Sequence, residues 1–249
     1  VEIYQLTRIN FEKILEKDTN FSSLFYKNCL TETFYRFRNT VANFSFSQHT
    51  LHEKTSELDE INKDLSHAKV IQNYFINTKY LDSKKSQDDG IKKSYIYKPC
   101  IDIGGDFFNV KELENGNIAV IIADVSGHGI TAALATGVLK SAFNFLINRL
   151  GNEPVKFMHA LNEHFSTVIT DLFATCYYAL IEPNNKKITF VKAGHHHPLF
   201  WKASKSEFLE IECTGIGLGM IKQGNFNKVE YTYEPGDKIL FYTDGIIEQ

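Results

Sequence analysis

The pattern of apolar and polar positions divides the chain into a helical first part and a strand-rich second part. Residues 1–50 contain neither proline nor glycine, and their apolar residues recur at helical spacing. This pattern predicts helices with a break near residues 18–20, where Thr19 or Asn20 is expected to cap the second helix. From residue 95 onward, short apolar runs are separated by turn residues, which is typical of strands.

A seven-residue repeat dominates the segment 51–80. Large side chains recur at the first position of the repeat, namely Leu51, Leu58, Leu65 and Gln72. Apolar side chains recur at the second position, namely Ile61, Ala68 and Phe75. This spacing favours a short parallel coiled coil through 51–75, and therefore a homodimer. The alternative is a solvated amphipathic helix that lies on its own domain, because the run of heptads is short.

The remaining chain predicts a polar linker and one α+β domain. Residues 81–93 are poor in apolar side chains and favour a linker, so we expect the domain to cover 94–249. Within it the pattern predicts strands at 95–99, 107–113, 118–123, 174–181, 187–192, 199–202, 208–212, 228–233 and 238–242, and helices at 131–150 and 154–169. Strands with one inserted helix pair indicate a central β-sandwich flanked by helices.

Composition excludes some classes of partner. The 249 residues are 43% hydrophobic and 23% charged, which is ordinary for a globular protein with a sizeable core. The net charge of −3, without a block of Lys and Arg, argues against nucleic acid or an anionic membrane surface as the main partner.

The cysteine pattern and the first residue of the chain give expectations about the cellular compartment of the protein. Cys29, Cys100, Cys176 and Cys213 form no CxxC pair, and we expect buried reduced thiols and a cytoplasmic protein. No uninterrupted apolar stretch approaches the roughly 18 residues of a transmembrane helix. The chain opens with Val1, so we expect that a preceding segment has been removed, which leaves a membrane tether in that segment open.

Three aspartates follow apolar strands and stand beside glycines. They are Asp106, Asp124 and Asp244. A carboxylate at the tip of a buried strand is costly unless a positive charge pairs with it, and no Lys or Arg lies between Glu114 and Lys140. Divalent Mg²⁺ and Mn²⁺ prefer such oxygen ligands, so the sequence indicates a metal site.

Four segments together resemble one family. They read Gly-Gly-Asp-Phe-Phe at 104–108, Ala-Asp-Val-Ser-Gly-His-Gly at 123–129, Ala-Gly-His at 193–195 and Tyr-Thr-Asp-Gly at 242–245. In this order they resemble the SpoIIE/RsbU-type serine phosphatases, the bacterial branch of the metal-dependent type 2C protein phosphatases. The resemblance runs from about residue 95 to the end of the chain. It implies the type 2C fold and two Mn²⁺ or Mg²⁺ ions.

The resemblance also assigns roles to individual residues. Asp124 is expected to bridge both ions, Asp106 and Asp244 each to complete a coordination sphere, and the backbone carbonyl of Val125 to be a further ligand. A water activated by the ions would then attack a phosphoserine on a regulatory protein, such as an anti-sigma-factor antagonist. In this family a helix such as 51–75 commonly relays a signal from an upstream sensor domain.

For the histidines beside these motifs, structural roles are favoured over metal binding. For His128, hydrogen bonding within the turn is favoured over a metal or proton-transfer role, because hard cations prefer oxygen ligands. The consecutive histidines 195–197 cannot easily face one ion, so we interpret Gly194 and His195 as a loop-structuring element.

One departure from the family pattern concerns the last part of the chain. The family continues beyond the motif at Asp244 to a further acidic motif, whereas this chain ends at Gln249. We therefore expect this polypeptide to hold one metal site weakly and to have low or no activity. The alternatives are a catalytically silent dimeric signalling module of the same fold, or another metal-dependent hydrolase such as a nuclease, which the near-neutral charge disfavours.

Overall fold

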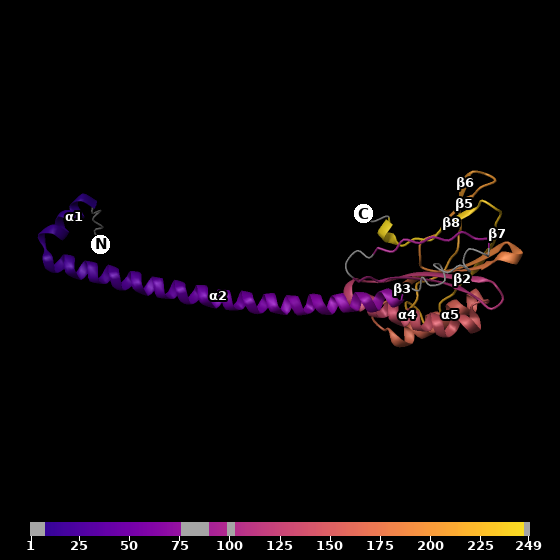
Figure 1. The fold of residues 1–249 in the computed structure, drawn as a ribbon, viewed down its shortest axis with the longest axis horizontal. Coiled ribbons are helices and arrows are strands. Elements are labelled where there is room, and N and C mark those ends of the chain that lie inside the picture. Colours follow the sequence, from indigo (N-terminus) through magenta and orange to yellow (C-terminus); the bar gives the residue numbers. More distant parts are fainter. Residues whose placement is uncertain (1–7, 76–89, 99–102, 247–249) are drawn as a thin grey trace. The chain divides into compact units, whose positions relative to one another are not determined.

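The structure is a computed structural model that describes residues 8–75, 90–98 and 103–246. The chain forms two compact units, residues 1–63 and 64–249. The first unit contains α1 (Arg8–Lys17) and most of α2 (Thr19–Phe75) (Figure 1). From Asp64 onward, α2 belongs to the second unit.

The break between α1 and α2 lies where the sequence predicts it, but its cap differs. The carboxylate of Asp18 accepts hydrogen bonds from the backbone N–H groups of Asn20 and Phe21, both at 3.0 Å. These are two of the donors that the start of a helix leaves unpaired. The capping residue is therefore Asp18, and the prediction of Thr19 or Asn20 is wrong.

The predicted seven-residue repeat lies on one continuous helix. Leu51 and Leu58 are exposed, with 62% and 58% of their surface accessible, whereas Leu65 is partly buried and Gln72 is buried. The repeat thus passes from an exposed face into the packing of the second unit. Residues 76–80 lie outside the described part of the chain, and the coiled coil stays a prediction.

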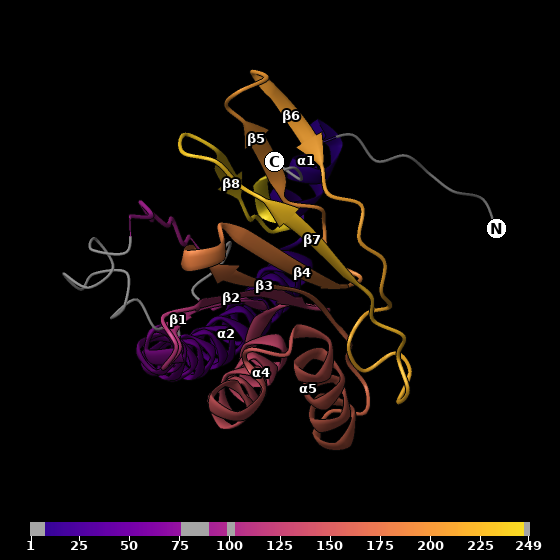
Figure 2. The same cartoon turned by 90° about the vertical axis from the view of Figure 1, so that its right-hand side faces the viewer.

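The second unit has three layers. One layer holds the helices α4 (Gly129–Leu150) and α5 (Pro154–Val168). They cover an antiparallel sheet in the order β1-β2-β3-β4-β7, with bounds Asp106–Glu112, Ile118–Val125, Ala174–Glu182, Lys187–Ala193 and Lys228–Thr232. The third layer is a sheet in the order β6-β5-β8, with bounds Glu207–Glu210, Leu199–Lys202 and Lys238–Leu240 (Figure 2). Short 3₁₀ turns occupy Pro183–Asn185 and Asp244–Ile246. The predicted α+β fold with two sheets and flanking helices is confirmed.

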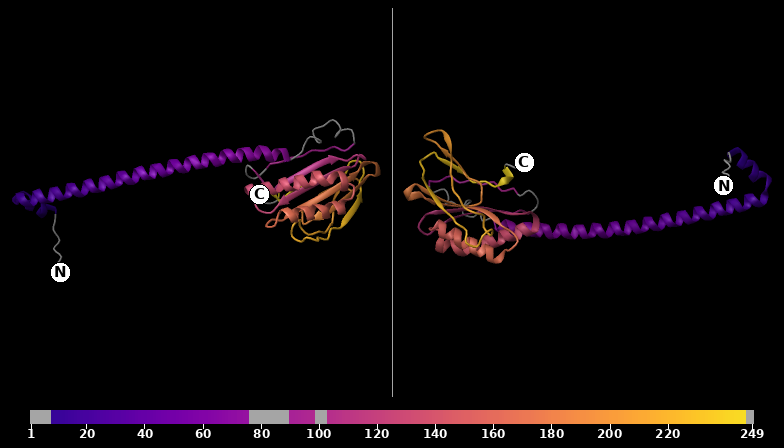
Figure 3. Two further views of the ribbon diagram at one scale, coloured as in Figure 1. Left: turned by 90° about the horizontal axis from the view of Figure 1, so that it is seen from below. Right: turned by 180° about the vertical axis from the view of Figure 1, so that it is seen from behind.

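Two cores hold these layers together. Between the helices and the five-stranded sheet lie Ile121, Phe143 and Phe157, and between the two sheets lie Ile122 and Phe200 among others. Consecutive residues of β2 therefore enter different cores, which is why nearly every position of this strand is apolar. Figure 3 shows α4 and α5 running together along one face of the sheet.

The composition of α4 follows from this packing. Among the described residues, α4 is the one helix long and apolar enough to cross a membrane by length and composition. Its buried face, which includes Ala132, Leu139 and Phe143, packs in the core beneath the sheet. A core position explains the apolar content without a membrane.

The first predicted strand of the domain is absent. Residues 95–98 are described and form no strand, which corrects the prediction for 95–99, and Pro99 lies outside the described residues. The rings of Tyr95 and Tyr97 instead pack against Phe108 of β1, with centroids 5.5 and 6.2 Å apart. Side-chain packing, and not a backbone ladder, explains the apolar alternation. Most of the predicted linker, residues 81–89, lies outside the described residues.

The cysteines follow the expectation in part. Cys176 and Cys213 are free and buried, as predicted. Cys29 is exposed on α2, so the prediction of a buried thiol is wrong there, because the residues around it on this helix are exposed as well. Cys100 lies outside the described residues.

Candidate active site

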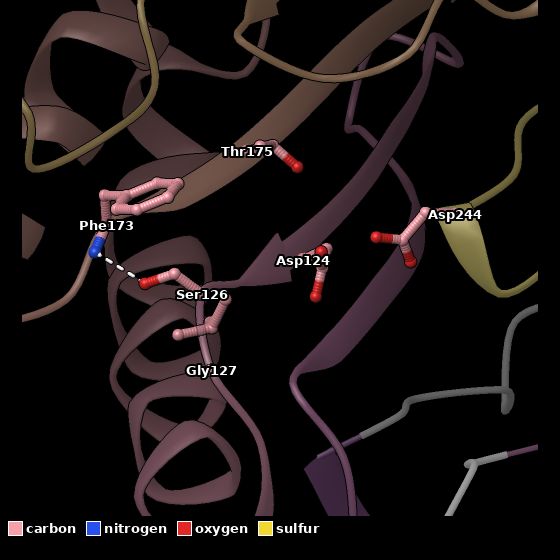
Figure 4. A pocket seen from close by; sticks show the side chains of 7 residues that line it. Asp124, Ser126, Gly127, Phe173, Thr175 and Asp244 are labelled. Atoms are coloured by element: carbon pink, nitrogen blue, oxygen red, sulfur yellow. Dashed lines mark hydrogen bonds between the residues drawn. The ribbon is translucent and has the colours of Figure 1, made fainter. Parts of the chain in front are cut away.

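Backbone pairing and one side-chain hydrogen bond join the segments that carry the three predicted aspartates. Asp106 at the start of β1 is the register partner of Asp124 near the end of β2. The hydroxyl of Thr243 donates to Oδ2 of Asp106 at 3.2 Å, which joins the segment before Asp244 to β1. Figure 4 shows the carboxylates of Asp124 and Asp244 turned toward a common space.

That space is a cavity of about 500 Å³. Its walls come from the end of β2, the start of β3 and the 3₁₀ turn, and the lining residues are Asp124, Val125, Ser126, Gly127, Phe173, Thr175 and Asp244. None of these residues, all in the described part of the chain, is Lys or Arg. An anionic substrate would therefore need a positive charge that the lining itself does not supply.

The environment of Asp106 shows the cost of gathering these carboxylates. Burial raises the pKa of Asp106 above its ordinary value, the hydrogen bond from Thr243 acts in the opposite direction, and the charge of Asp244 raises it further. Burial, together with the charge of Asp106, also raises the pKa of the nearby Tyr97 phenol to about 12. A bound cation would relieve this repulsion.

The donor set fits a hard divalent cation better than zinc. Carboxylates of Asp124 and Asp244 and the backbone of Val125 line the cavity, and the lining contains neither His nor Cys. Among the described residues, no group of three or more His, Cys, Asp or Glu side chains is arranged to hold a metal ion. Mg²⁺ commonly uses one or two carboxylates and keeps several waters, so such a group is not required.

Gly105 is a glycine because the loop before Asp106 passes very close to β2. A Cβ atom at Gly105 would lie 2.6 Å from the carbonyl oxygen of Val125 and 3.2 Å from Oδ1 of Asp124. The backbone N–H of Val125 donates to the carbonyl of Gly105 at 3.1 Å. This close approach places the loop against two predicted metal ligands.

The turn between β2 and α4 is built by glycine backbones and by Ser126. Gly127 and Gly129 have φ angles of 89° and 74°, a region that favours glycine. Ser126 bonds Phe173 twice, from its N–H to the carbonyl at 2.9 Å and from the N–H of Phe173 to its Oγ at 3.1 Å. His128, which the structure describes, is exposed and makes no capping hydrogen bond. The predicted hydrogen-bonding role of His128 in the turn is therefore wrong.

His195 joins β3 to the segment that follows β8, which confirms its predicted loop-structuring role. Its Nδ1 lies 2.7 Å from the hydroxyl of Thr175, and its Nε2 lies 3.0 Å from the carbonyl oxygen of Tyr242. A carbonyl only accepts, so Nε2 carries the proton and Nδ1 accepts from Thr175. His197 bonds elsewhere, with Nδ1 2.5 Å from the carbonyl of Ile211, so the consecutive histidines do not converge on one ion.

The titration of His195 predicts a dependence of stability on pH. Burial lowers its pKa from 6.5 to about 4. Between these values the unfolded chain binds more protons than the folded chain, so stability falls as the pH drops from about 6.5 to 4. His195→Gln does not titrate, and the wild type should lose up to about 3 kcal/mol relative to this variant across that range. Urea unfolding at pH 7 and pH 4.5 measures the difference, and parallel profiles for the two proteins would contradict it.

Sequence reasoning missed four residues of the site. Phe173 and Thr175 line the cavity, Ser126 anchors Phe173, and Thr243 bonds Asp106. Thr175 carried a usable signal, because it is the register partner of Asp124 in the β2–β3 pair. The others depend on contacts between segments far apart along the chain.

Comparison with known proteins agrees with this architecture. The family model described as "Stage II sporulation protein E (SpoIIE)" matches residues 114–249, which include Asp124, Val125 and Asp244. The SiaA-PP2C domain of Pseudomonas aeruginosa has a similar fold, with a TM-score of 0.66 and 19% identity over 77% of this chain and 74% of that one.

Two sequence relatives are named for an activity. Phosphoserine phosphatase RsbU of Bacillus subtilis (strain 168) is 29% identical over 191 residues, 76% of this chain and 55% of the relative. Phosphoserine phosphatase RsbP of the same organism is 27% identical over 166 residues, 65% of this chain and 41% of the relative. The chain thus spans about half the length of these relatives. Because the family model covers more than half of its residues, the chain belongs to the SpoIIE/RsbU family of serine phosphatases with the type 2C fold.

Proposed function

We propose that the chain is the catalytic part of a metal-dependent protein serine/threonine phosphatase that hydrolyses a phosphoserine on a regulatory protein. The cavity carries the proposal, because it gathers Asp124 and Asp244 with Asp106 beside them and has no basic lining residue. Such a site suits a phosphate only when cations are bound. The names of RsbU and RsbP, both phosphoserine phosphatases, support this reaction.

Asp106, Asp124, Asp244 and the carbonyl of Val125 would hold two Mn²⁺ or Mg²⁺ ions. When bound, these ions supply an activated water and neutralise charge on the phosphoryl oxygens. The chain contributes the remaining geometry. Ser126 and Gly127 line the cavity directly before α4, so the positive end of this helix dipole lies beside the anionic group.

Phe173 and Thr175 shape the other wall. Phe173 is 39% exposed, its backbone is held by Ser126, and it forms an apolar edge of the cavity. Thr175 is held by His195 through its hydroxyl. These two side chains would limit how a phosphoserine and its flanking residues enter.

The direct test is phosphate release from a phosphoserine peptide in the presence and absence of Mn²⁺. We expect turnover that requires the metal and stops when a chelator removes it. Equal turnover with and without metal would contradict the proposed chemistry, and absence of both turnover and Mn²⁺ binding would favour the alternative below.

The alternative is a catalytically silent signalling module of the same fold. It is favoured by one observation, that the described residues include no group of three His, Cys, Asp or Glu side chains arranged around an ion. Calorimetric titration with Mn²⁺ separates the two functions. A phosphatase binds the ion at this site, whereas a silent module shows no saturable binding.

The substrate and the control of the enzyme are further proposals. An anti-sigma-factor antagonist is the proposed phosphoprotein, on the basis of the family resemblance. We also propose a cytoplasmic enzyme that forms a homodimer through 51–75 and receives its signal through that segment. The exposure of Leu51, Leu58 and Ile61 supports a partner for this face of α2.

The homodimer gives a direct prediction. Leu58→Asp places a charge on the apolar face of the repeat and should weaken self-association at least tenfold, because an unpaired carboxylate would be buried between the helices. Sedimentation equilibrium measures the change. Ser56→Asp is the matched control, since it adds the same charge at an exposed position outside the repeat. Equal association of both variants would contradict a dimer through 51–75.

A further inference from the structure

The loop that pairs with the start of β3 exposes two large apolar side chains. This loop, residues 215–222, contains Met220 and Ile221, which are 48% and 51% exposed. Surface loops are usually polar, so adjacent apolar side chains exposed on one loop point to a contact with another molecule. Methionine is frequent on surfaces that bind varied apolar partners, because its side chain is unbranched and flexible.

A buried asparagine of α5 holds this loop. Asn162 is 1% exposed, and its Nδ2 donates to the carbonyl oxygens of Ile221 and Lys222 at 2.9 and 3.1 Å. Its Oδ1 accepts from the N–H of Gly219 at 2.9 Å. Three backbone groups of the loop are thus bound to one side chain of the core. The apolar side chains are therefore presented by an ordered loop, which lowers the entropy cost of binding a partner.

Pairing with β3 places Met220 beside the cavity. Ala174 and Leu218 exchange two backbone hydrogen bonds, at 2.9 and 2.8 Å. In an antiparallel pair the next residues along, here Thr175 and Gly217, lie across from each other and are directed to the same side, on which Thr175 lines the cavity. The sulfur of Met220 lies 3.2 Å from the position that a Cβ atom at Gly217 would occupy. The thioether therefore lies next to the wall that Thr175 forms.

The charges at this edge of the cavity are balanced. The two segments that meet here, 169–173 and 215–222, contain one acidic and one basic residue, Asp171 and Lys222. Charge thus favours neither an acidic nor a basic partner, and apolar contact remains as the basis of recognition. Phe173, which is partly exposed and lines the cavity, extends the apolar edge. Because an extended chain advances roughly 3.3–3.6 Å per residue, the neighbours of a phosphoserine in the cavity would reach this edge.

We propose that Phe173, Met220 and Ile221 form an apolar docking edge that binds the side chain next to the phosphoserine, so that the enzyme selects phosphoserines with apolar neighbours. The inference rests on the proposed function, because it takes the cavity to hold the phosphoserine. The substrate class that fits is an extended protein segment with Leu, Ile or Val beside the phosphorylated serine. Contact with the edge removes apolar surface of both partners from water, which stabilises the bound segment.

The test compares two phosphoserine peptides that differ only in the residues on either side of the phosphoserine, leucine in one and asparagine in the other. Phosphate release at saturating Mn²⁺ gives kcat/KM for each peptide. We expect the wild type to favour the leucine peptide about tenfold. Met220→Gln keeps the length of the side chain but makes its end polar, and should reduce this preference to about threefold or less. A general loss of activity lowers both values and cancels in their ratio.

Two variants are controls for this test. Met220→Leu keeps an apolar side chain at this position and should retain the preference. Phe208→Gln removes an exposed apolar side chain from β6, which does not line the cavity, and should also retain it. Equal kcat/KM of the wild type for the two peptides, or an unchanged preference in Met220→Gln, would overturn the inference and leave the phosphatase proposal intact.

Two other outcomes are distinguishable from these. If the wild type with Mn²⁺ hydrolyses neither the peptides nor p-nitrophenyl phosphate, the proposed function is overturned and the inference with it. If Met220→Gln weakens self-association in sedimentation equilibrium, the edge is a contact between copies of the chain, which would overturn the inference alone.

Discussion

Asp124→Asn is expected to reduce metal-dependent hydrolysis of a phosphoserine peptide by about 10³-fold or more. Asparagine has nearly the same shape, so β2 and the cavity should persist, but it carries no charge with which to hold two cations. Asp124 lines the cavity together with Asp244 and is the register partner of Asp106, so it is the central carboxylate of the three. The rate of phosphate release at saturating Mn²⁺ measures the loss.

Stabilisation by Mn²⁺ shows whether Asp124→Asn has lost the metal site alone or the whole fold. A ligand that binds only the folded state raises the free energy of unfolding, so Mn²⁺ should stabilise the wild type and not Asp124→Asn. Without metal, Asp124→Asn should be at least as stable as the wild type, because it removes one of the neighbouring negative charges. Asp171→Asn is the matched control, because Asp171 is exposed, lies two residues before Phe173 and does not line the cavity. Retained turnover in Asp124→Asn would refute the assignment of this residue.

Gly105→Ala is expected to reduce Mn²⁺ binding and turnover about 100-fold, and to destabilise the chain by about 2–4 kcal/mol. The added methyl group would lie 2.6 Å from the carbonyl oxygen of Val125, and this neighbour is backbone that cannot rotate away. The loop must then move from β2, and Asp106 moves with it. Calorimetry with Mn²⁺ and urea unfolding without metal measure the two effects.

Gly245→Ala is the control for this prediction. It adds the same methyl group beside another predicted ligand, Asp244, but into open space with no atom within 4 Å. It should leave Mn²⁺ affinity within about threefold of the wild type, because nothing has to shift. A Gly105→Ala protein with wild-type stability and affinity would show that the close approach to Val125 has no role in the site.

Much of the fold could be predicted because its signals are local. The turn at 114–117 and the apolar runs on either side specified the hairpin of β1 and β2, and the register of that hairpin places Asp106 opposite Asp124. The prediction of a strand at 95–99 was wrong for the described residues 95–98 because alternating aromatic residues can pack as side chains without a backbone partner.

In the helical part, too, local features could be predicted and contacts distant in sequence could not. The break between α1 and α2 was predictable from local polarity, but its capping residue was not, because Asp18, Thr19 and Asn20 can all accept from a helix start. The repeat at 51–75 specified a helix with one apolar face. It did not specify that Gln72 turns into the packing of the second unit, since that requires Gly104, 32 residues further on.

The sequence by itself determined the order of elements, the double burial of β2 and the identity of the three aspartates, because these depend on periodicity and on residue types within short windows. The tertiary structure alone decided that Thr243 reaches Asp106 across 137 residues and that His195 ties Tyr242 to Thr175. These contacts join the end of the chain to the five-stranded sheet. Pairings over such separations follow from how whole layers pack, and no local pattern encodes that packing.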